Sequence, residues 1–455
     1  MIKTPHSRGR IYAVALAGMA MVGGILLLAF GAPVLHRMMV KPGAVQMLEI
    51  APFDRVVLIQ GPEITRIRVD VIYDRGERQA VGFPEGLAHY VEHLAHFNAA
   101  DHQDDRAIER HSNAWTTTKA TGYFASGSPD QLRSLLRRVT ATAQPISDLP
   151  ADFAAQERGI VLREYEARGT TPAKAAQEAE YLRALAGGAG WARAVIGTPD
   201  SIARFTQAIA ADLHSRTHRL SQATLVVAGP FDPRDLKRAI AALSLPVARP
   251  VVPRPIPQIT LPQVGVDMAR VPTRGTDMAR VLWAQVIPRS ACDTPAHCDV
   301  LWELVLDRLG AARAGGMLGP LSYDAFLTQR VGLSVFDLGA DHRVLEMTAE
   351  PDVGVPIEDL WHGMQDALRQ SLATPVTQDD LDRLKNGWQD RRRDEQNPVT
   401  YTFRLVQGQL AQGAPMYDIH AERAALAAIT PQDMTDVLAQ IAAADRAVVR
   451  LYAKP

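Results

Sequence analysis

Residues 86–97 read GLAHYVEHLAHF and combine apolar residues with histidine and glutamate at helical spacing. His89 and His93 stand four positions apart, so a helix places both imidazoles on one face, where their nitrogens can meet one metal ion. Glu92 lies on the same side, beside such an ion without being required to bind it. Metal-assisted hydrolysis needs two neutral imidazoles to hold zinc and an adjacent carboxylate to take a proton from water. The stretch therefore predicts a helix over residues 87–97 that carries a hydrolytic zinc site.

A catalytic zinc ion also needs a third protein ligand and an open position for water. His96 shares the helix face, but it lies about 10.5 Å along the axis from His89, too far for both to reach one ion. We expect His96 to be packed or hydrogen-bonded. The sequence QERGIVLREYEAR, residues 156–168, offers Glu157 and Glu164 on one face of another expected helix. Their spacing alone leaves open whether they serve the metal or form an amphipathic edge.

The sequence on either side of these helices has the pattern of an α+β protein with two similar domains. Residues 56–76 predict a strand, a turn and a second strand, and residues 223–243 predict a buried strand followed by a helix. A proline-rich linker at 246–262 separates an N-terminal domain, residues 45–245, from a C-terminal domain, residues 263–455. The other expected elements are helices at 129–142, 152–168, 201–215 and 299–309, and strands at 280–286, 332–350 (a pair) and 447–452. The similar order suggests an internal duplication, although no sequence identity proves it.

The composition excludes several classes of protein. With 455 residues, 47% hydrophobic and 22% charged, the chain is globular rather than disordered. Lys plus Arg is 49 against 50 for Asp plus Glu, so no global field is present to hold nucleic acid. Two cysteines cannot form a disulfide-rich scaffold or a four-cysteine zinc site.

The N-terminus predicts attachment to a membrane. Residues 1–10 carry three cations, and residues 11–35 carry no charge. About 25 apolar residues span roughly 37 Å as a helix, enough to cross a hydrocarbon core of about 30 Å. Abundant Ala and Arg with little Lys are typical of bacterial proteins. We therefore expect a single-pass signal anchor in the bacterial inner membrane, with residues 1–10 cytoplasmic and the catalytic part in the periplasm; secretion to the periplasm after signal cleavage is the alternative.

At this point the sequence resembles the pitrilysin/insulinase family of zinc metallopeptidases, the inverzincins. HxxEH followed by E-x6-E carries the resemblance, which runs from about residue 45 to the end, and short members such as the mitochondrial processing peptidase β subunit are similar in length. SNAWTTTKATGYF, residues 112–124, resembles the family's N-A-x-T edge strand beside the zinc. VIGTPDSIARF, residues 195–205, resembles its G-T-P-E-S-I segment. One departure is His96, which stands where the family usually has an aromatic residue that this chain places at Phe97.

The resemblance implies a processing-peptidase-like fold and a role for each matching residue. His89, His93 and Glu164 are expected to bind one Zn²⁺, Glu92 to act as general base, and Glu157 to support the ligands. Asn113 and Ala114 are expected to bind the backbone of a peptide substrate by strand addition. The implied activity is a zinc endopeptidase or processing peptidase. A non-catalytic peptide-binding or scaffold subunit of a membrane complex is the alternative, and a non-peptidase zinc hydrolase is a third reading.

The resemblance also implies a partner subunit. Family members enclose peptides between two facing halves, and the opposite half supplies an Arg and a Tyr within a segment like L-R-E-x-x-G-L-A-Y. The matching segment here is LTQRVGLSV, residues 327–335, which has Thr328 and Val335 at those two positions. We expect a heterodimer with a homologous chain that carries the pair. The alternative is a homodimer in which another side chain substitutes: Arg330, Tyr323 or Phe336.

Cys292 and Cys298 are the first and last residues of the sequence CDTPAHC. In an oxidising periplasm their close spacing favours a disulfide that closes this loop. Two unpaired thiols are the alternative, and they are expected if the domain is cytoplasmic.

Overall fold

The computed structural model describes residues 41–61, 63–101, 108, 110–168, 180–185, 193–243, 245, 269–270, 279–289, 294–339, 341–393, 397–444 and 446–452. Within these ranges, no helix has both the length and the apolar character needed to span a membrane. The expected membrane segment, residues 11–35, and the expected linker, residues 246–262, lie outside the described residues.

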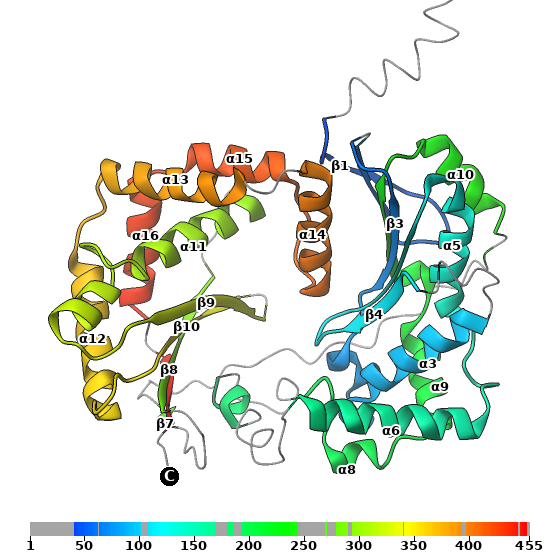
Figure 1. The fold of residues 1–455 in the computed structure, drawn as a ribbon, viewed down its shortest axis with the longest axis horizontal. Helices are drawn as coiled ribbons and strands as arrows, with labels where there is room; N and C mark the ends of the chain where they lie inside the picture. The colour runs from blue at the N-terminus through cyan, green and yellow to red at the C-terminus, as the bar shows by residue number, and fades with distance from the viewer. Residues whose placement is uncertain are drawn as a thin grey trace, which may run out of the picture.

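Two α+β halves lie side by side, each built on one sheet (Figure 1). The first half, residues 41–245, contains a six-stranded sheet in the order β1-β2-β6-β3-β5-β4. Its strands are β1 (Val45–Leu48), β2 (Arg55–Gln60), β3 (Ile67–Tyr73), β4 (Ser112–Thr116), β5 (Thr121–Gly127) and β6 (Ala223–Gly229). The second half, residues 269–452, contains the sheet β7-β11-β8-β10-β9. Its strands are β7 (Ala269–Arg270), β8 (Arg280–Pro288), β9 (Val331–Leu338), β10 (His342–Ala349) and β11 (Arg446–Tyr452).

The two sheets repeat one topology. Strands β2, β6, β3, β5 and β4 correspond in order to β7, β11, β8, β10 and β9. In each sheet the first of these pairs is parallel and the other three are antiparallel. The expected internal duplication is therefore present in the strand order, although the sequence does not show it.

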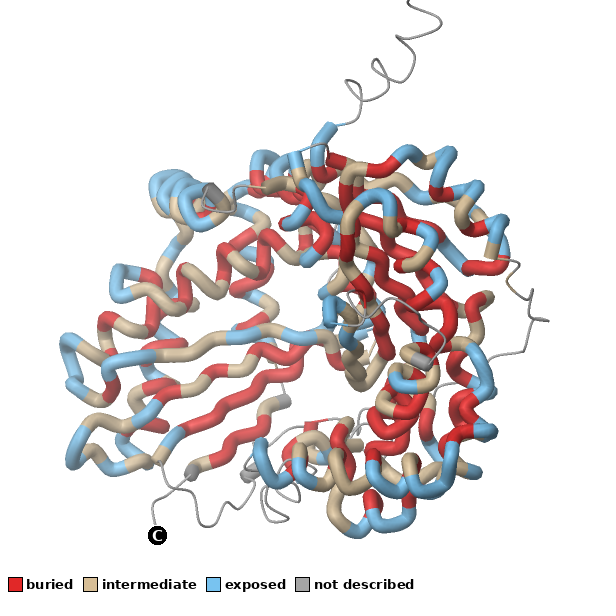
Figure 2. The backbone as a smooth tube through the Cα atoms, turned by 45° about the vertical axis from the view of Figure 1, so that its right-hand side comes forward, coloured by how far each residue is buried: buried red, intermediate tan, exposed pale blue. Residues whose placement is uncertain are grey.

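Helices pack on one face of each sheet and enclose the two main cores (Figure 2). The first half has α3 (Leu87–Asp101), α5 (Leu132–Thr140), α6 (Ala151–Ala167), α8 (Pro199–Ile202), α9 (Gln207–Thr217) and α10 (Pro233–Ala241). The second half has α11 (Pro295–Leu309), α12 (Ile357–Ala373), α13 (Gln378–Arg393), α14 (Pro398–Ala411), α15 (Ile419–Ala428) and α16 (Pro431–Ala442). Short 3₁₀ or π turns are η2 (Glu77–Ala80), η3 (Pro129–Gln131), η4 (Ala141–Ala143), η5 (Leu220–Gln222) and η6 (Pro320–Asp324).

Two expected helices are interrupted. The helix expected at 201–215 is wrong as a single element, because the chain forms α8 and then restarts as α9. Thr206 causes the restart: its side chain accepts the Ile209 N–H as an N-cap, which fixes a new helix start. The helix expected at 129–142 is α-helical only in α5, with a 3₁₀ turn at each end.

Each half contributes a helix to the sheet of the other half. Helix α14, from the second half, covers the face of the first sheet opposite to α3 (Figure 1). Its apolar stripe contains Val399, Phe403, Val406 and Leu410, and it packs on Val57, Ile59, Ile72, Ala120, Val226 and Ala228. Gln407 of the same helix donates to the buried carboxylate of Asp70 at 2.9 Å. The first sheet is thus buried on both faces only when the second half is present.

The reciprocal contact comes from residues 180–185 of the first half. Tyr181 and Leu185 pack on the second sheet, against Leu282, Ala284, Val286, Leu338, Val344 and Val448. The Tyr181 hydroxyl donates to Glu346 Oε2 at 2.7 Å. Because apolar surface on both sheets is covered by the opposite half, the two halves stabilise each other.

A pair of buried histidines lies at the end of α9, on the face of the first sheet that carries α3. His214 and His218, on and just after α9, stack with ring centroids 4.5 Å apart. His214 Nε2 donates to the Thr142 carbonyl at 2.9 Å, and the His218 ring is 2.7 Å from the Tyr123 hydroxyl. Burial lowers the pKa of His214 to about 4 and lowers the pKa of His218 well below its ordinary value. Both rings are therefore neutral in the folded protein at neutral pH.

We predict that acid destabilises the fold through these rings. The unfolded chain takes up a proton near pH 6.5, whereas folded His214 takes one up only near pH 4, so stability falls as the pH drops through this window. His214→Gln keeps a donor for Thr142 and should reduce the loss of unfolding free energy between pH 7 and pH 4.5 by about 2 kcal/mol. Urea unfolding of both proteins at the two pH values measures the difference. Equal pH dependence would contradict the prediction.

Candidate metal centre

Helices α3 and α6 bring three of the expected ligands together. His89, His93 and Glu164 each offer one atom to a group whose atoms all lie within 4.8 Å of one another. His89 Nε2 is 3.4 Å from Glu164 Oε2, and His93 Nε2 is 3.9 Å from Glu164 Oε1. Within the described residues this is the single group of at least three His, Cys, Asp or Glu side chains placed to hold a metal ion. His96 is outside it and instead contacts the guanidinium of Arg138, as expected.

The donor set fits a divalent cation of the zinc type. Glu164 Oε2 is buried and makes no hydrogen bond, although it lies close to His89. Burial, with smaller effects from the charges of His93 and Arg168, lowers the pKa of His89 to about 3. The imidazole is therefore neutral and keeps a lone pair for a metal. Two imidazole nitrogens and one carboxylate oxygen form a common three-ligand set of catalytic zinc sites.

Glu157 orients one of the ligands. Its buried carboxylate lies 3.0 Å from His93 Nδ1, through Oε2. A carboxylate acceptor at Nδ1 fixes the proton there and directs the Nε2 lone pair toward Glu164 and His89. Glu157 and Glu164, which are seven positions apart on one face of α6, thus lie on different sides of His93, and of these two only Glu164 belongs to the metal group.

Glu92 lies beside this group and lines the same cavity, of about 460 Å³. Its Oε2 accepts a hydrogen bond from Thr116 Oγ1 at 2.6 Å. Burial raises the pKa of Glu92 to about 7, opposed by that hydrogen bond and by the charge of His93. The carboxylate is therefore placed as a base next to the metal group without belonging to it.

The start of α3 is held by a second buried carboxylate, Glu77. Its oxygens accept the N–H groups of Gly86 (2.9 Å) and Ala88 (3.2 Å), and Arg193 donates to it at 3.0 Å. A carboxylate is favourable at a helix N-terminus because the free N–H groups and the helix dipole are positive there. Burial still raises the pKa of Glu77 to about 7 against the opposing charge of Arg193. His89 follows directly after this anchored turn.

Gly86 and Gly197 allow the two segments to touch. Both have positive φ, 84° and 81°, a region that favours glycine. A Cβ on Gly86 would lie 2.5 Å from the Gly197 nitrogen, and a Cβ on Gly197 would lie 2.6 Å from the Glu85 carbonyl oxygen. The segment at residues 193–201 therefore supports α3, the helix that carries His89 and His93, through direct backbone contact.

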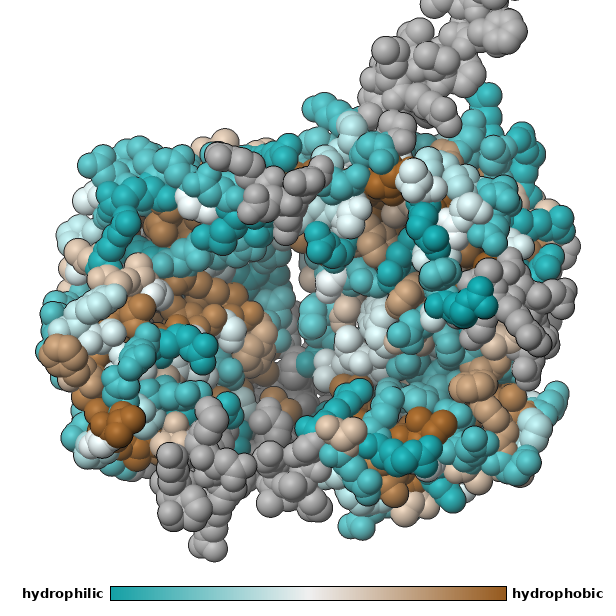
Figure 3. All heavy atoms as spheres, in the orientation of Figure 1, coloured by the Kyte–Doolittle hydropathy of each residue, from teal (hydrophilic) through white to brown (hydrophobic). Residues whose placement is uncertain are grey.

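Asn113 and Ala114 lie on β4, an edge strand that pairs with β5 alone among the described strands. Both residues line the cavity with His89 and Glu164. The Ala114 N–H donates to the side-chain oxygen of its neighbour Asn113 at 2.9 Å. In Figure 1, β4 lies on the side of the first half that faces the second half, and Figure 3 shows the surface hollowed between the halves. An open strand edge thus borders the metal group.

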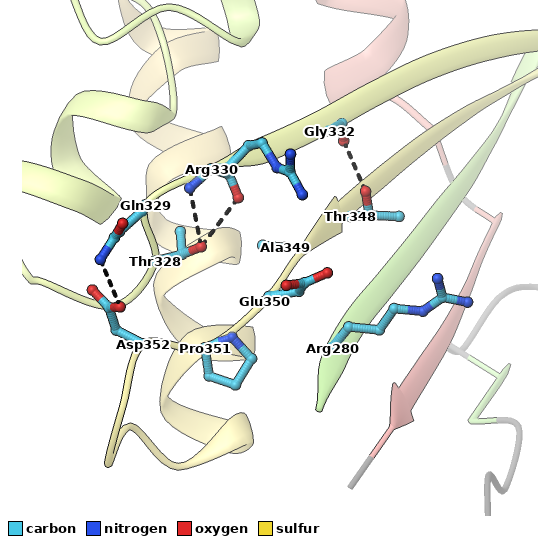
Figure 4. A pocket seen from close by; sticks show the side chains of 10 residues that line it. All are labelled: Arg280, Thr328, Gln329, Arg330, Gly332, Thr348, Ala349, Glu350, Pro351 and Asp352. Atoms are coloured by element: carbon cyan, nitrogen blue, oxygen red, sulfur yellow. Dashed lines mark hydrogen bonds between the residues drawn. The ribbon is translucent and has the colours of Figure 1, made fainter. Parts of the chain in front are cut away.

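A second cavity, of about 790 Å³, lies in the second half and is lined by part of the segment 327–335, which was matched by resemblance to the expected Arg/Tyr segment (Figure 4). Thr328 is buried. Its hydroxyl donates to the Arg330 carbonyl and accepts from the Arg330 N–H. Arg330 is exposed and its side chain extends away from Thr328. Val335 packs on the core of the second half. Tyr323 and Phe336, the two aromatic residues that could replace the missing Tyr in a homodimer, are 67% and 37% exposed.

Cys292 lies outside the described residues, so its disulfide with Cys298 stays a prediction. Cys298 itself is buried in the first turns of α11.

Sequence reasoning missed three residues that position the site. Thr116 is the last residue of the N-A-x-T segment, and this position could have marked it as part of the site. Its hydrogen bond to Glu92 is visible only in the structure. Glu77 and Arg193 are 116 positions apart, and no local spacing reveals their pairing.

No protein-family model matches the sequence, and no curated protein is recognisably similar to it. Solved structures are similar. A protease from Helicobacter pylori has a TM-score of 0.72 at 19% identity, over 90% of this chain and 99% of that one. The periplasmic protease PqqL from Escherichia coli has a TM-score of 0.71 at 16% identity, over 90% of this chain and 48% of PqqL.

An inactive M16 peptidase domain from Pseudomonas fluorescens has a TM-score of 0.69 at 18% identity, over 90% of this chain and 98% of that one. The chain thus spans nearly all of two of these proteins and about half of PqqL. Likeness at this level of identity establishes the fold, and the expectation of two similar α+β domains is confirmed. The chain has the two-domain α+β fold of the M16 peptidases.

Proposed function

We propose that the chain is a zinc-dependent endopeptidase that cleaves peptides or unfolded protein segments. One observation carries the proposal: His89, His93 and Glu164 form a group fit for a metal, with the carboxylate of Glu92 beside it and an open strand edge along the same cavity. A hydrolytic site for peptides needs these three parts together. Several proteins of similar structure are named as proteases, which supports the proposal.

In the proposed mechanism, the peptide adds to the edge of β4 in extended form. The Ala114 N–H then exchanges its internal acceptor, Asn113 Oδ1, for a substrate carbonyl. Zinc bound by His89, His93 and Glu164 would polarise the scissile carbonyl and lower the pKa of water. Glu92 takes the proton of the attacking water and passes it to the leaving amine.

The main alternative is a non-catalytic subunit that binds peptides or forms part of a membrane complex. One structural relative is described as an inactive domain, so the fold also occurs without activity. The metal group and the adjacent Glu92 favour an enzyme, because binding a peptide alone requires neither.

We further propose that the chain works at the periplasmic face of a bacterial inner membrane, held by residues 11–35, with a homologous partner. The proposal of a partner rests on Thr328 and Val335, which offer neither an Arg nor a Tyr at the matching positions. PqqL is about twice as long as the part that aligns with this chain, and the structure of the first half of PqqL alone is also similar, with a TM-score of 0.70.

Removal of Glu157 should weaken metal binding without abolishing it. Glu157→Gln loses the charged acceptor at His93 Nδ1 and should lower zinc affinity about 10- to 100-fold. His89→Ala should bind more weakly still, because a ligand is lost. Competition with a chromophoric chelator measures both constants. Equal affinity of wild type and Glu157→Gln would contradict the role of Glu157.

Glu92→Gln should keep bound zinc and lose hydrolysis of a quenched peptide by at least about 100-fold, because the base is lost while the ligands remain. Zinc content and turnover are measured on the same sample. Glu166→Gln is the matched control, since Glu166 is an exposed carboxylate on α6 and should change neither quantity. If the Glu92→Gln protein retains most of its turnover, Glu92 is not the base.

The full chain purified alone with saturating zinc should hydrolyse peptides at least about 100-fold more slowly than with its partner, because oxyanion donors are missing. Co-expression with a homologous chain that carries the Arg/Tyr pair should restore the rate. Full activity of the isolated chain would show that it acts alone or as a homodimer.

A further inference from the structure

The hydroxyl of Thr116 is the hydrogen-bond donor to Glu92 within the described residues. The bond is short, 2.6 Å from Oγ1 to Oε2, and it crosses from the last residue of β4 to the middle of α3. We propose that Thr116 is a positioning residue that fixes the Glu92 carboxylate for catalysis and connects it to the strand that receives the substrate. This inference rests on the proposed function.

A buried carboxylate needs such a donor. Glu92 is 7% exposed, and a buried charged oxygen without a hydrogen bond is costly. A glutamate side chain also has three rotatable bonds, and each unrestrained rotamer draws the carboxylate away from the reacting water. A charge-assisted hydrogen bond from a hydroxyl at this length is strong and directional. Thr116 therefore selects one carboxylate position beside His89 and His93.

The register of β4 places Thr116 on the correct face. In the ladder with β5, Ala114 lies opposite Tyr123 and Thr116 opposite Thr121. Ala114 and Tyr123 pack into the core beneath α3, so the alternating side chains of β4 direct Thr116 to the same face.

Trp115 points to the opposite face and packs across Gly122 of the neighbouring strand β5. Its indole ring crosses Gly122 so closely that a Cβ there would lie 2.3 Å from the ring. It also packs beside the cluster that α14 forms with the first sheet. Thr116 thus belongs to a strand that is packed on both faces.

The same strand carries the proposed substrate edge at Asn113 and Ala114. A peptide that adds to this edge would lie two residues from the hydroxyl that holds Glu92. The substrate and the base would therefore be positioned by the same short stretch of one strand, residues 114–116.

The test compares Thr116→Val, which removes the hydroxyl at nearly constant shape, with Thr116→Ser, which keeps it. On a quenched peptide with saturating zinc, Thr116→Val should lower kcat about 10- to 100-fold with KM changed less than about threefold. Thr116→Ser should recover kcat to within about threefold of wild type. Zinc affinity, measured by chelator competition, should be the same in all three proteins, because the ligands are untouched.

Thr121→Val is the matched control. Thr121 lies directly opposite Thr116 on the same pair of strands, is buried, and donates its hydroxyl to the Arg75 carbonyl instead of to Glu92. This variant reports any general loosening of the sheet and should keep the wild-type kcat. A similar fall in kcat for both valine variants would overturn the proposal in favour of a structural role.

A second measurement does not depend on activity. Crystal structures of the metal-free Thr116→Val and wild-type proteins should show the Glu92 carboxylate displaced by more than about 1 Å, or spread over two rotamers, in the variant alone. An unmoved carboxylate together with unchanged kcat would overturn the proposal. If the wild type with its partner hydrolyses no peptide, the proposed function fails, whereas the position of Glu92 in the two crystals still decides whether Thr116 holds it.

Discussion

The buried carboxylate of Glu77 at the start of α3 is the contact on which the metal centre depends. It accepts hydrogen bonds from the N–H groups of Gly86 and Ala88 at the start of the helix, which would otherwise be buried without partners. Arg193 balances its charge. Because a helix is rigid over a few turns, fixing its first turn also fixes the direction of His89 and His93. The close approach of Gly86 and Gly197 belongs to the same contact.

The centre is assembled from segments far apart in the chain. Helix α3 supplies both imidazoles, α6 supplies Glu164 and Glu157, and β4 supplies Thr116. The Tyr90 hydroxyl of α3 donates to the Ala154 carbonyl of α6 at 2.6 Å and holds these two helices in register. The geometry of the candidate metal group is therefore a property of the folded first half, and an ion that bound it would stabilise the fold by mass action.

The duplicated architecture uses its two copies differently. Helix α11 occupies in the second half the place of α3 in the first, between the strands that correspond to β3 and β4. Its inward residues are apolar, among them Val300, Leu304 and Val305, and its Glu303 accepts a hydrogen bond from Trp388. The second copy thus uses this helix for packing, and through α14 it also completes the burial of the first sheet.

The sequence by itself determined the elements whose signals are local. Spacing of four and three positions places His89, His93 and Glu92 on one helix side, and alternation marks β2, β3 and β6, because both periodicities arise within a few residues. Spacing alone left open which carboxylate of α6 joins the metal group, and only the family resemblance pointed to Glu164. The tertiary structure places Glu164, and not Glu157, in that group, because α6 packs on α3 with the two side chains on different sides of His93. It also decided that Thr116 reaches Glu92, that Arg193 pairs with Glu77 and that α14 covers the first sheet. These contacts join residues from 24 to more than 300 positions apart, and no short-range periodicity carries information about such pairs.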